Sequence, residues 1–297
     1  MDFDKMSVSS IIVTFNPIIE KLSILISELC SQAFNVIIVD NGSTNSSEIK
    51  RLKSIYHNLE VIFLPGNVGI AAAQNIGIHK SIESNAQFSL FFDQDSKIPN
   101  DFVNQMVKDF LCIKGQRKIA ALGPTLRDNR YGKIYPVIRL NKLGLREKII
   151  PDVTDSQPFD VSCVIASGCL MENSVLLDGS GLMNEQLFID YVDTEWCLRM
   201  ISRGYGVYVT PNVIMEHEIG DEHINMFGLV IPVHSANRRY YRVRNGFCLF
   251  KMVHVPKLLA MREVIFSLIH QIILCVYKKD ANYIRLYFRS LFDAINK

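Results

Sequence analysis

The sequence predicts an α/β fold in which helices cover both faces of a mainly parallel sheet. Three observations support this prediction. Short β-branched segments alternate with helical segments from residue 8 onward, several predicted strands end in polar clusters, and the composition is that of a globular chain. Of the 297 residues, 48% are hydrophobic and 21% are charged, which excludes a disordered chain.

The first elements form a strand–helix–strand unit. Val8–Thr14 is short and rich in β-branched residues, as expected of a buried strand. Asn16 and Pro17 then supply a helix N-cap and a first helical residue. Apolar residues follow at helical spacing, and Ala33–Val39 predicts the second strand. The helical positions are Ile18, Leu22, Leu25 and Leu29.

The alternation continues to about residue 122. The predicted segments are a helix from Ser46, a strand at Glu60–Leu64, a helix at Ala71–Ser84, a strand at Phe88–Phe92, a helix at Asp101–Ile113 and a strand at Ile119–Leu122. Residues Gly123–Pro158 resemble a loop, and we expect them to be partly mobile and to form one wall of a ligand site. Further on, the pattern predicts strands at Gly206–Val209 and Pro211–Met215 and a helix at Thr194–Arg203 that Gly204 ends.

Polar residues follow the first four predicted strands. In open α/β sheets, ligands bind outside the carboxyl ends of the strands, so these clusters are the candidate site. They are Thr14-Phe15-Asn16, Asp40-Asn41-Gly42-Ser43, Pro65-Gly66-Asn67 and Asp93-Gln94-Asp95.

Asp93 and Asp95 form the first candidate for chemistry. The period of a strand places both carboxylates on one face, where they suit Mg²⁺ or Mn²⁺ shared with substrate phosphates. The alternative is a polar turn that caps the next helix. Asp40 likewise either accepts a hydrogen bond from a base or ribose or belongs to a turn.

Three acids precede or open the helix at Thr194–Arg203: Asp190, Asp193 and Glu195. Asp193 is either an N-cap or a general base, since a helix start keeps a carboxylate ionised and able to accept a proton. His217 is either structural or a third metal ligand.

Five ordered motifs resemble the family 2 glycosyltransferases of GT-A fold. Within that family, the Asp-Gln-Asp-Ser motif and the Asp-x-Glu-Trp-Cys-Leu-Arg motif are similar to those of bacterial L-rhamnosyltransferases. The resemblance covers residues 8–245. The motifs are IIVTFNP at Ile11–Pro17, VDNGS at Val39–Ser43, GNVGIAAAQNIGI at Gly66–Ile78, FFDQDS at Phe91–Ser96 and FIDYVDTEWCLR at Phe188–Arg199.

The resemblance implies a role for each site residue. Asp93, Asp95 and His217 would hold a divalent cation, Mg²⁺ or Mn²⁺, and Asp193 would be the general base. The family's usual first acid is Val192 here, and Asp190 would partly replace it as a second catalytic acid. The residues implied to bind the nucleotide sugar are Thr14, Phe15, Asn16, Asp40, Asn67, Gly69, Asp93, Gln94, Arg238, Arg239, Tyr241 and Arg244.

The resemblance also implies an activity. It would be inverting, metal-dependent transfer of L-rhamnose from dTDP-β-L-rhamnose to a hydroxyl of a lipid-linked bacterial polysaccharide. The alternatives are a family 2 enzyme with another donor, such as a UDP-hexose or UDP-galactofuranose, a nucleotidyltransferase that makes the sugar nucleotide, and a non-catalytic nucleotide-sugar-binding protein. A nucleotidyltransferase normally has a Gly-rich basic loop after its first strand, and Thr14-Phe15-Asn16-Pro17 differs from it.

The net charge of +2 conceals two unlike parts of the chain. Residues 238–297 carry 12 Lys and Arg against 3 Asp and Glu, whereas residues 1–237 carry 20 against 27. The resemblance implies a GT-A domain at 1–245, and the charge division indicates a basic, amphipathic helical region at 246–297. That region would lie on an anionic membrane surface, or alternatively pack on the catalytic domain or a second copy in a homodimer. No nucleic-acid motif accompanies the charge.

The expected location is the cytoplasm, at the inner face of the plasma membrane. Seven cysteines without a C-x-x-C pair indicate reduced thiols, and the acidic start differs from a secretory signal. The longest weakly charged apolar stretch, Val264–Tyr277, is 14 residues and too short to cross a bilayer.

Overall fold

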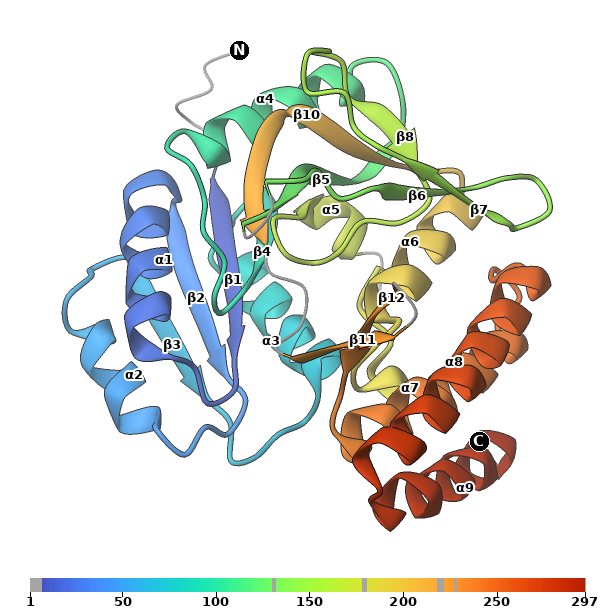
Figure 1. Cartoon of the computed structure of the whole chain (residues 1–297). Coiled ribbons are helices and arrows are strands. Elements are labelled where there is room, and N and C mark those ends of the chain that lie inside the picture. The colour runs from blue at the N-terminus through green and yellow to red at the C-terminus, as the bar shows by residue number, and fades with distance from the viewer. Residues whose placement is uncertain (1–6, 130–131, 178–180, 218–221, 227–228, 297) are drawn as a thin grey trace.

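A computed structural model gives the fold, and it describes residues 7–129, 132–177, 181–217, 222–226 and 229–296. Eight strands form one sheet in the order β3-β2-β1-β4-β9-β5-β10-β8, with helices on both faces (Figure 1). The strands are β1 (Val8–Thr14), β2 (Asn35–Asp40), β3 (Leu59–Phe63), β4 (Phe88–Asp93), β5 (Ile119–Asp128), β8 (Phe159–Val161), β9 (Leu170–Glu172) and β10 (Gly206–His217). The predicted α/β class is confirmed.

The longer helices cover the sheet or follow it in the chain. They are α1 (Ile19–Gln32), α2 (Ser46–Lys53), α3 (Ile70–Glu83), α4 (Phe102–Lys114), α6 (Val192–Ser202), α7 (Ala236–Cys248), α8 (Lys257–Lys278) and α9 (Ala281–Asn296). Shorter elements are α5 (Asn173–Leu176) and the 3₁₀ turns η2 (Glu185–Leu187) and η3 (Leu249–Lys251).

The first half of the sheet is parallel, as predicted. β1 pairs with β2 and β4, and β2 pairs with β3. The register places Thr14 beside Asp40 and Val13 beside Asp93. The carboxyl ends of three strands therefore meet at one edge of the sheet, which is where the polar clusters begin.

The second half of the sheet is mixed. β9 is antiparallel to both β4 and β5, β10 is parallel to β5, and β8 is antiparallel to β10. The end of β10 bends toward the loop after β4, where Glu216 pairs with Lys97. This pairing brings His217 to the same edge as Asp93.

Two hydrophobic clusters pack on opposite faces of the sheet. Alternation along β1 sends Ile12 to one face and Ile11 to the other. The first cluster includes residues of α1, α2 and α4, and the second includes residues of α3, α5 and α6. A rigid sheet packed on both faces thus supports the loops at its carboxyl edge.

One sequence-based boundary is corrected. Residues 123–158 are not all loop, because β5 continues to Asp128 and a hairpin follows, formed by β6 (Val137–Leu140) and β7 (Arg146–Ile149). Residue 245, the predicted end of the first domain, lies inside α7. A second hairpin, β11 (Glu222–Met226) and β12 (Leu229–Val233), precedes α7.

The apolar stretch at Val264–Tyr277 lies in a longer helix than the sequence indicated. α8 has 22 residues. Charged residues such as Lys257 and Arg262 limit the apolar run in the sequence, but the helix includes them. Within the described residues, α8 alone is long and apolar enough to cross a membrane by length and composition, with a mean hydropathy of 1.7 over its most apolar window. The length argument against a membrane-spanning segment is therefore wrong.

Candidate active site

The carboxylate of Asp40 holds the first two loops of the site together. Thr14 Oγ1 donates a hydrogen bond to Asp40 Oδ1 at 2.9 Å, and the backbone N–H of Ser43 donates to Oδ2 at 3.2 Å. The Ser43 hydroxyl also donates to Oδ1. Asp40 and Thr14 are buried, so both act in the structure by fixing the shape of the loops.

Phe15, Asn16 and Gln94 form the rim beside these loops. Phe15 N–H donates to Gln94 Oε1 at 2.8 Å, which joins the loop after β1 to the loop after β4. Asn16 Oδ1 accepts from the backbone N–H of Thr44 at 2.8 Å. The ring of Phe15 is 46% exposed, so it is available to a ligand at the sheet edge.

Asn67 and Gly69 shape the start of α3. Asn67 Oδ1 accepts hydrogen bonds from Asn41 Nδ2 at 3.1 Å and from Gly69 N–H at 2.9 Å. Gly69 has a φ of +90°, and a Cβ there would lie 2.6 Å from the ring of Phe188. That ring stacks on Tyr241 of α7 at 4.3 Å between centroids. Only glycine allows this approach.

Acidic and basic side chains from four distant segments influence one another at the sheet edge. Burial raises the pKa of Asp93, Asp95 raises it further, and His217 and Arg238 lower it. Burial and then the charge of Asp93 raise the pKa of Asp193 to about 7, while a hydrogen bond from the backbone of Ala166 lowers it. The structure therefore brings Asp93, Asp95, Asp193, His217 and Arg238 close enough for their charges to act on one another.

Ser167 fixes the loop of Asp93 from behind. Its Oγ lies 2.7 Å from Ser96 Oγ and accepts from the N–H of Asp93 at 3.4 Å. Gly168 N–H donates to Phe91 O at 2.7 Å, which ties the segment to β4. This short segment also leads from Ala166, so it links the Asp93 loop to Asp193.

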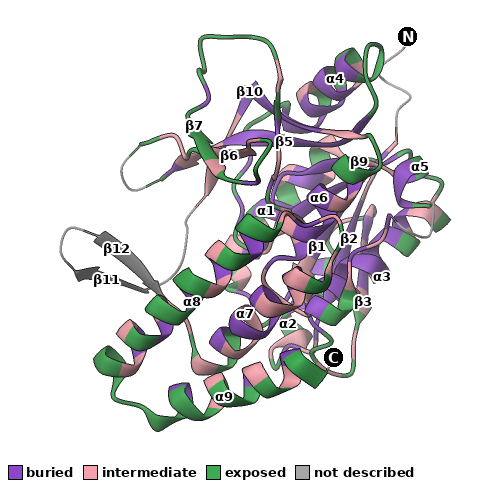
Figure 2. Ribbon diagram, turned by 90° about the vertical axis from the view of Figure 1, so that its right-hand side faces the viewer, coloured by how far each residue is buried: buried purple, intermediate pink, exposed green. Residues whose placement is uncertain are grey.

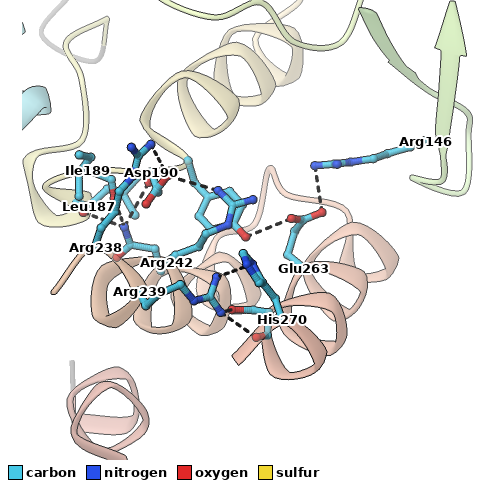
Figure 3. A network of polar contacts seen from close by, with 12 residues as sticks. Arg146, Leu187, Ile189, Asp190, Arg238, Arg239, Arg242, Glu263 and His270 are labelled. Atoms are coloured by element: carbon cyan, nitrogen blue, oxygen red, sulfur yellow. Dashed lines mark hydrogen bonds and ion pairs between the residues drawn. The ribbon is translucent and has the colours of Figure 1, made fainter. Parts of the chain in front are cut away.

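Asp190 lies in a strained loop directly before α6. Phe188, Asp190 and Tyr191 all have positive φ, near +64°, which side chains with a Cβ rarely adopt outside functional sites. Asp190 Oδ1 pairs with Arg238 at 3.4 Å and with Arg242 at 3.3 Å (Figure 3). Its other oxygen, Oδ2, is buried and has no hydrogen-bond partner among the described residues.

The loop of Asp190 is also tied to the C-terminal helices (Figure 3). Tyr191 donates from its hydroxyl to Glu263 Oε2 on α8 at 3.0 Å. Glu263 in turn pairs with Arg146 of β7 at 2.9 Å. Asn245 Nδ2 donates to the backbone oxygens of Leu187 and Ile189, at 2.7 and 2.8 Å.

Two predicted donor-binding arginines are corrected. Arg239 is 1% exposed and points to α8, where it donates to Gln271 Oε1 at 3.0 Å and to Ser267 O at 2.7 Å. Arg244 is also buried and donates to the backbone oxygens of Gln186 and Leu187. The guanidinium groups of Arg239 and Arg244 are therefore occupied by internal hydrogen bonds. Arg238, adjacent to Arg239, faces Asp190 instead.

The acids at the sheet edge fit a divalent cation in part. Within the described ranges, no three His, Cys, Asp or Glu side chains form a complete ligand group by themselves. Mg²⁺ and Mn²⁺, however, are commonly held by one or two carboxylates while water and substrate phosphates complete the shell. Asp93 and Asp95 would supply those carboxylates, and His217 lies near enough to lower the pKa of Asp93.

Solved structures share this fold at low sequence identity. Staphylococcus aureus TarS, residues 1–349, superposes with a TM-score of 0.58 at 14% identity, over 98% of this chain and 80% of that chain. GalNAc-T7, crystallised with UDP, GalNAc and Mn²⁺, gives a TM-score of 0.58 at 14% identity over 87% of this chain, which spans about half (54%) of that chain. These likenesses show that the chain has a GT-A-like fold.

The sequence comparisons define the family. Residues 9–166 match the model of glycosyl transferase family 2. Over 291 residues the chain is 43% identical to the dTDP-rhamnosyl transferase RfbF of Shigella flexneri, covering 97% of this chain and 95% of that protein. The chain belongs to glycosyl transferase family 2 and is a glycosyltransferase.

The sequence alone did not assign a role to Phe188, whose ring stacks on Tyr241. Glu195, which the sequence grouped with the acids, is buried and pairs with Arg199 at 2.8 Å, and His254 Nε2 lies 2.8 Å from the same carboxylate. Arg242 lies one helical turn after Arg238 and pairs with Asp190.

Proposed function

We propose that this chain transfers L-rhamnose from dTDP-β-L-rhamnose to an acceptor hydroxyl, with inversion at the anomeric carbon. The observation that carries the proposal is 43% identity over 97% of the chain to a dTDP-rhamnosyl transferase. The grouping of Asp93, Asp95 and Asp193 at the carboxyl edge of the sheet supports it, because this reaction needs a diphosphate site beside a base.

The nucleotide end of the donor would occupy the loops after β1, β2 and β3. Phe15 offers an exposed ring to the base, and the polar atoms around Asn16 and Asn67 border the nucleoside. Asp40 orders these loops from below through Thr14 and Ser43.

Arg238 would neutralise charge on the departing dTDP. It is 46% exposed at its side chain and acts on the pKa of Asp93, so it faces the predicted diphosphate position. Positive groups at this position lower the barrier to sugar transfer, because they stabilise the negative charge that develops on the oxygens of the departing diphosphate.

Asp93 and Asp95, with His217, would hold Mg²⁺ or Mn²⁺ at the same diphosphate. When bound, the cation supplies Lewis-acid stabilisation of the leaving group. Burial raises the pKa of the Asp93 carboxyl and the charge of Asp95 raises it further, and a bound cation would favour the ionised carboxylates.

Asp193 would be the general base. It lies in the first turn of α6, beside Asp93, and its pKa near 7 suits proton transfer at neutral pH. Asp193 takes the proton of the acceptor hydroxyl as its oxygen bonds to the anomeric carbon. The bond from that carbon to the diphosphate oxygen breaks on the opposite face, so a β-linked donor yields an α-L-rhamnoside.

Asp190 would bind the substrate rather than remove the proton. Arg238 and Arg242 hold its Oδ1, and the buried Oδ2 is left as a hydrogen-bond acceptor. A sugar hydroxyl is the matching donor, since a buried acceptor without a partner is costly. The acceptor itself would be a growing bacterial polysaccharide on a lipid carrier, such as an O-antigen or a cell-wall rhamnan.

A donor panel tests this proposal. The purified chain is incubated with Mg²⁺ or Mn²⁺ and, in turn, dTDP-rhamnose, UDP-glucose, UDP-N-acetylglucosamine and UDP-galactofuranose, with lipid-linked glycan acceptors. We expect turnover with dTDP-rhamnose at least tenfold above the others, dependence on the cation, and an α-linked product by NMR. Preference for a UDP-sugar would overturn the donor assignment, and a β-linked product would overturn inversion.

A further inference from the structure

An exposed apolar surface runs along the C-terminal helices. On α8 the exposed apolar residues recur at intervals of three and four, so they share one side of the helix. On α9 a similar stripe recurs at helical spacing. We name these residues the outer face; they are Leu258, Met261, Ile265, Leu268, Ile269, Ile272 and Val276 of α8, and Ile284, Phe288, Phe292 and Ile295 of α9. Each is 38–76% exposed.

The opposite side of α8 is fixed to the body of the enzyme. Glu263, Ser267 and Gln271 are buried at intervals of four residues. Glu263 accepts from Tyr191, and Arg239 of α7 donates to both Ser267 and Gln271. Both helices lie at the right-hand side of the molecule in Figure 1, and α8 crosses the face turned toward the viewer in Figure 2. The outer face is therefore presented outward by a folded scaffold, not left over from an unpacked tail.

The charges around the outer face are basic. Between residues 251 and 296 there are seven Lys and Arg and three Asp and Glu. Glu263 is buried and paired with Arg146 and Arg262, and Asp293 accepts from Tyr240. Exposed basic residues occur along these helices at Lys257, Lys278, Lys279, Arg285 and Arg289, against one exposed acid, Asp280. Arg289 pairs with Asp293 at 3.7 Å.

We propose that the outer face docks on an anionic phospholipid bilayer, with α8 and α9 lying in the plane of the membrane surface. Apolar side chains enter the headgroup boundary while flanking Lys and Arg meet lipid phosphates. Basic residues near such a surface are attracted by its negative potential. Membrane docking does not depend on the donor sugar, so its failure in an experiment would leave the proposed function untouched, and the reverse also holds.

The charge pattern favours lipid over a second copy of the chain. Two copies joined through this face would bring like basic charges together, and α8 has no exposed acid to pair with them. A membrane-spanning α8 is also disfavoured. It would strip Glu263, Ser267 and Gln271 from the hydrogen bonds that they make with Tyr191 and Arg239.

Vesicle flotation tests the proposal with the full chain. Vesicles of phosphatidylcholine with 30% phosphatidylglycerol are compared with pure phosphatidylcholine, in low and high salt. The test variant changes Ile265, Ile272 and Val276 to Ser. The matched control changes three apolar residues of similar exposure on the catalytic domain, Ile24, Ile55 and Leu177, to Ser. Thermal unfolding verifies that both variants fold.

We expect the native chain and the control to float with anionic vesicles, and the test variant to lose at least tenfold in bound fraction. High salt should weaken binding. Equal flotation of the test variant would overturn the proposal, as would a native chain that ignores anionic vesicles. A dimer in sedimentation equilibrium that the test variant breaks, without vesicle binding, would assign the face to a second copy. Resistance to alkaline carbonate extraction would assign α8 as a membrane span.

Discussion

Asp190 and Asp193 are separated by two residues but have different surroundings. Asp190 is neutralised by two arginines, whereas Asp193 has burial and the charges of Asp93 and Asp190 acting on it, which raise its pKa to about 7. A base works only when ionised. Turnover should therefore rise about tenfold per pH unit below the pKa and level off above it. A cation bound at Asp93 would offset part of the repulsion between Asp93 and Asp193. The acidic limb of the rate profile should therefore lie near or below pH 7.

The Asp190→Asn substitution tests this coupling. It removes one negative charge that raises the pKa of Asp193, so the acidic limb of the kcat profile should move to lower pH. The measurement is kcat against pH from 5 to 9, with the exposed Asp152→Asn as the control. A limb that stays in place, or moves to higher pH, would contradict the assignment.

Gly69 and Gly66 make a matched pair for the nucleotide loops. Gly69→Ala should lower kcat/KM for the donor by at least tenfold, since its Cβ would lie 2.6 Å from Phe188 at a φ of +90° and displace the stack on Tyr241. Gly66→Ala should behave as the native enzyme, because its Cβ meets nothing within 4 Å. Steady-state kinetics separate the two, and equal losses would count against the stacking role.

For single residues, the motifs are a better guide to the positions of the acidic side chains than to those of the arginines. Asp93, Asp95 and Asp193 follow fixed strand and helix ends, so their position in the sequence sets their position in space. Arg238 and Arg239 are adjacent on α7, where successive side chains point about 100° apart. One therefore meets Asp190 and the other meets Gln271, a difference that composition and charge cannot indicate.

Among the elements, α8 depends on Gln271 for its attachment. Gln271 Oε1 accepts from buried Arg239, and its Nε2 donates to Tyr283 O of α9 at 2.7 Å. Gln271→Ala should lower the free energy of unfolding by about 1–3 kcal/mol, because it leaves buried groups unpaired. Urea denaturation measures this. The neighbouring exposed Ile272→Ala is the control, and an equally small change in both would refute the anchoring role.

The strands show why element prediction succeeds in one half of the sheet. β1, β2, β3 and β4 are short, mostly apolar segments in a regular alternation with helices, and the structure has them nearly as predicted. β9 has only three residues and inserts antiparallel between β4 and β5, a pairing that no local pattern records. β10 runs through Pro211, which falls at a register shift between Thr210 and Ile214, where a proline is tolerated.

For the whole molecule, α7 connects two surfaces. Its Arg238 and Arg242 face the loop of Asp190, while its Arg239 holds α8 and thereby the outer face. The charge division in the sequence predicted the two parts, but not that one helix joins them. An enzyme docked through the outer face would hold its active site at a fixed distance from the membrane that carries a lipid-linked acceptor.

In the proposed reaction, Asp193 removes the proton of the acceptor hydroxyl during transfer from dTDP-rhamnose. The most direct measurement compares Asp193→Asn with the native enzyme for transfer rate and, by calorimetry, for donor binding. We predict that kcat falls by about 10³-fold, in the range typical of a lost general base, while the donor Kd stays within twofold. The exposed Asp155→Asn should match the native enzyme. Turnover at the native rate by Asp193→Asn would show that Asp193 is not the general base.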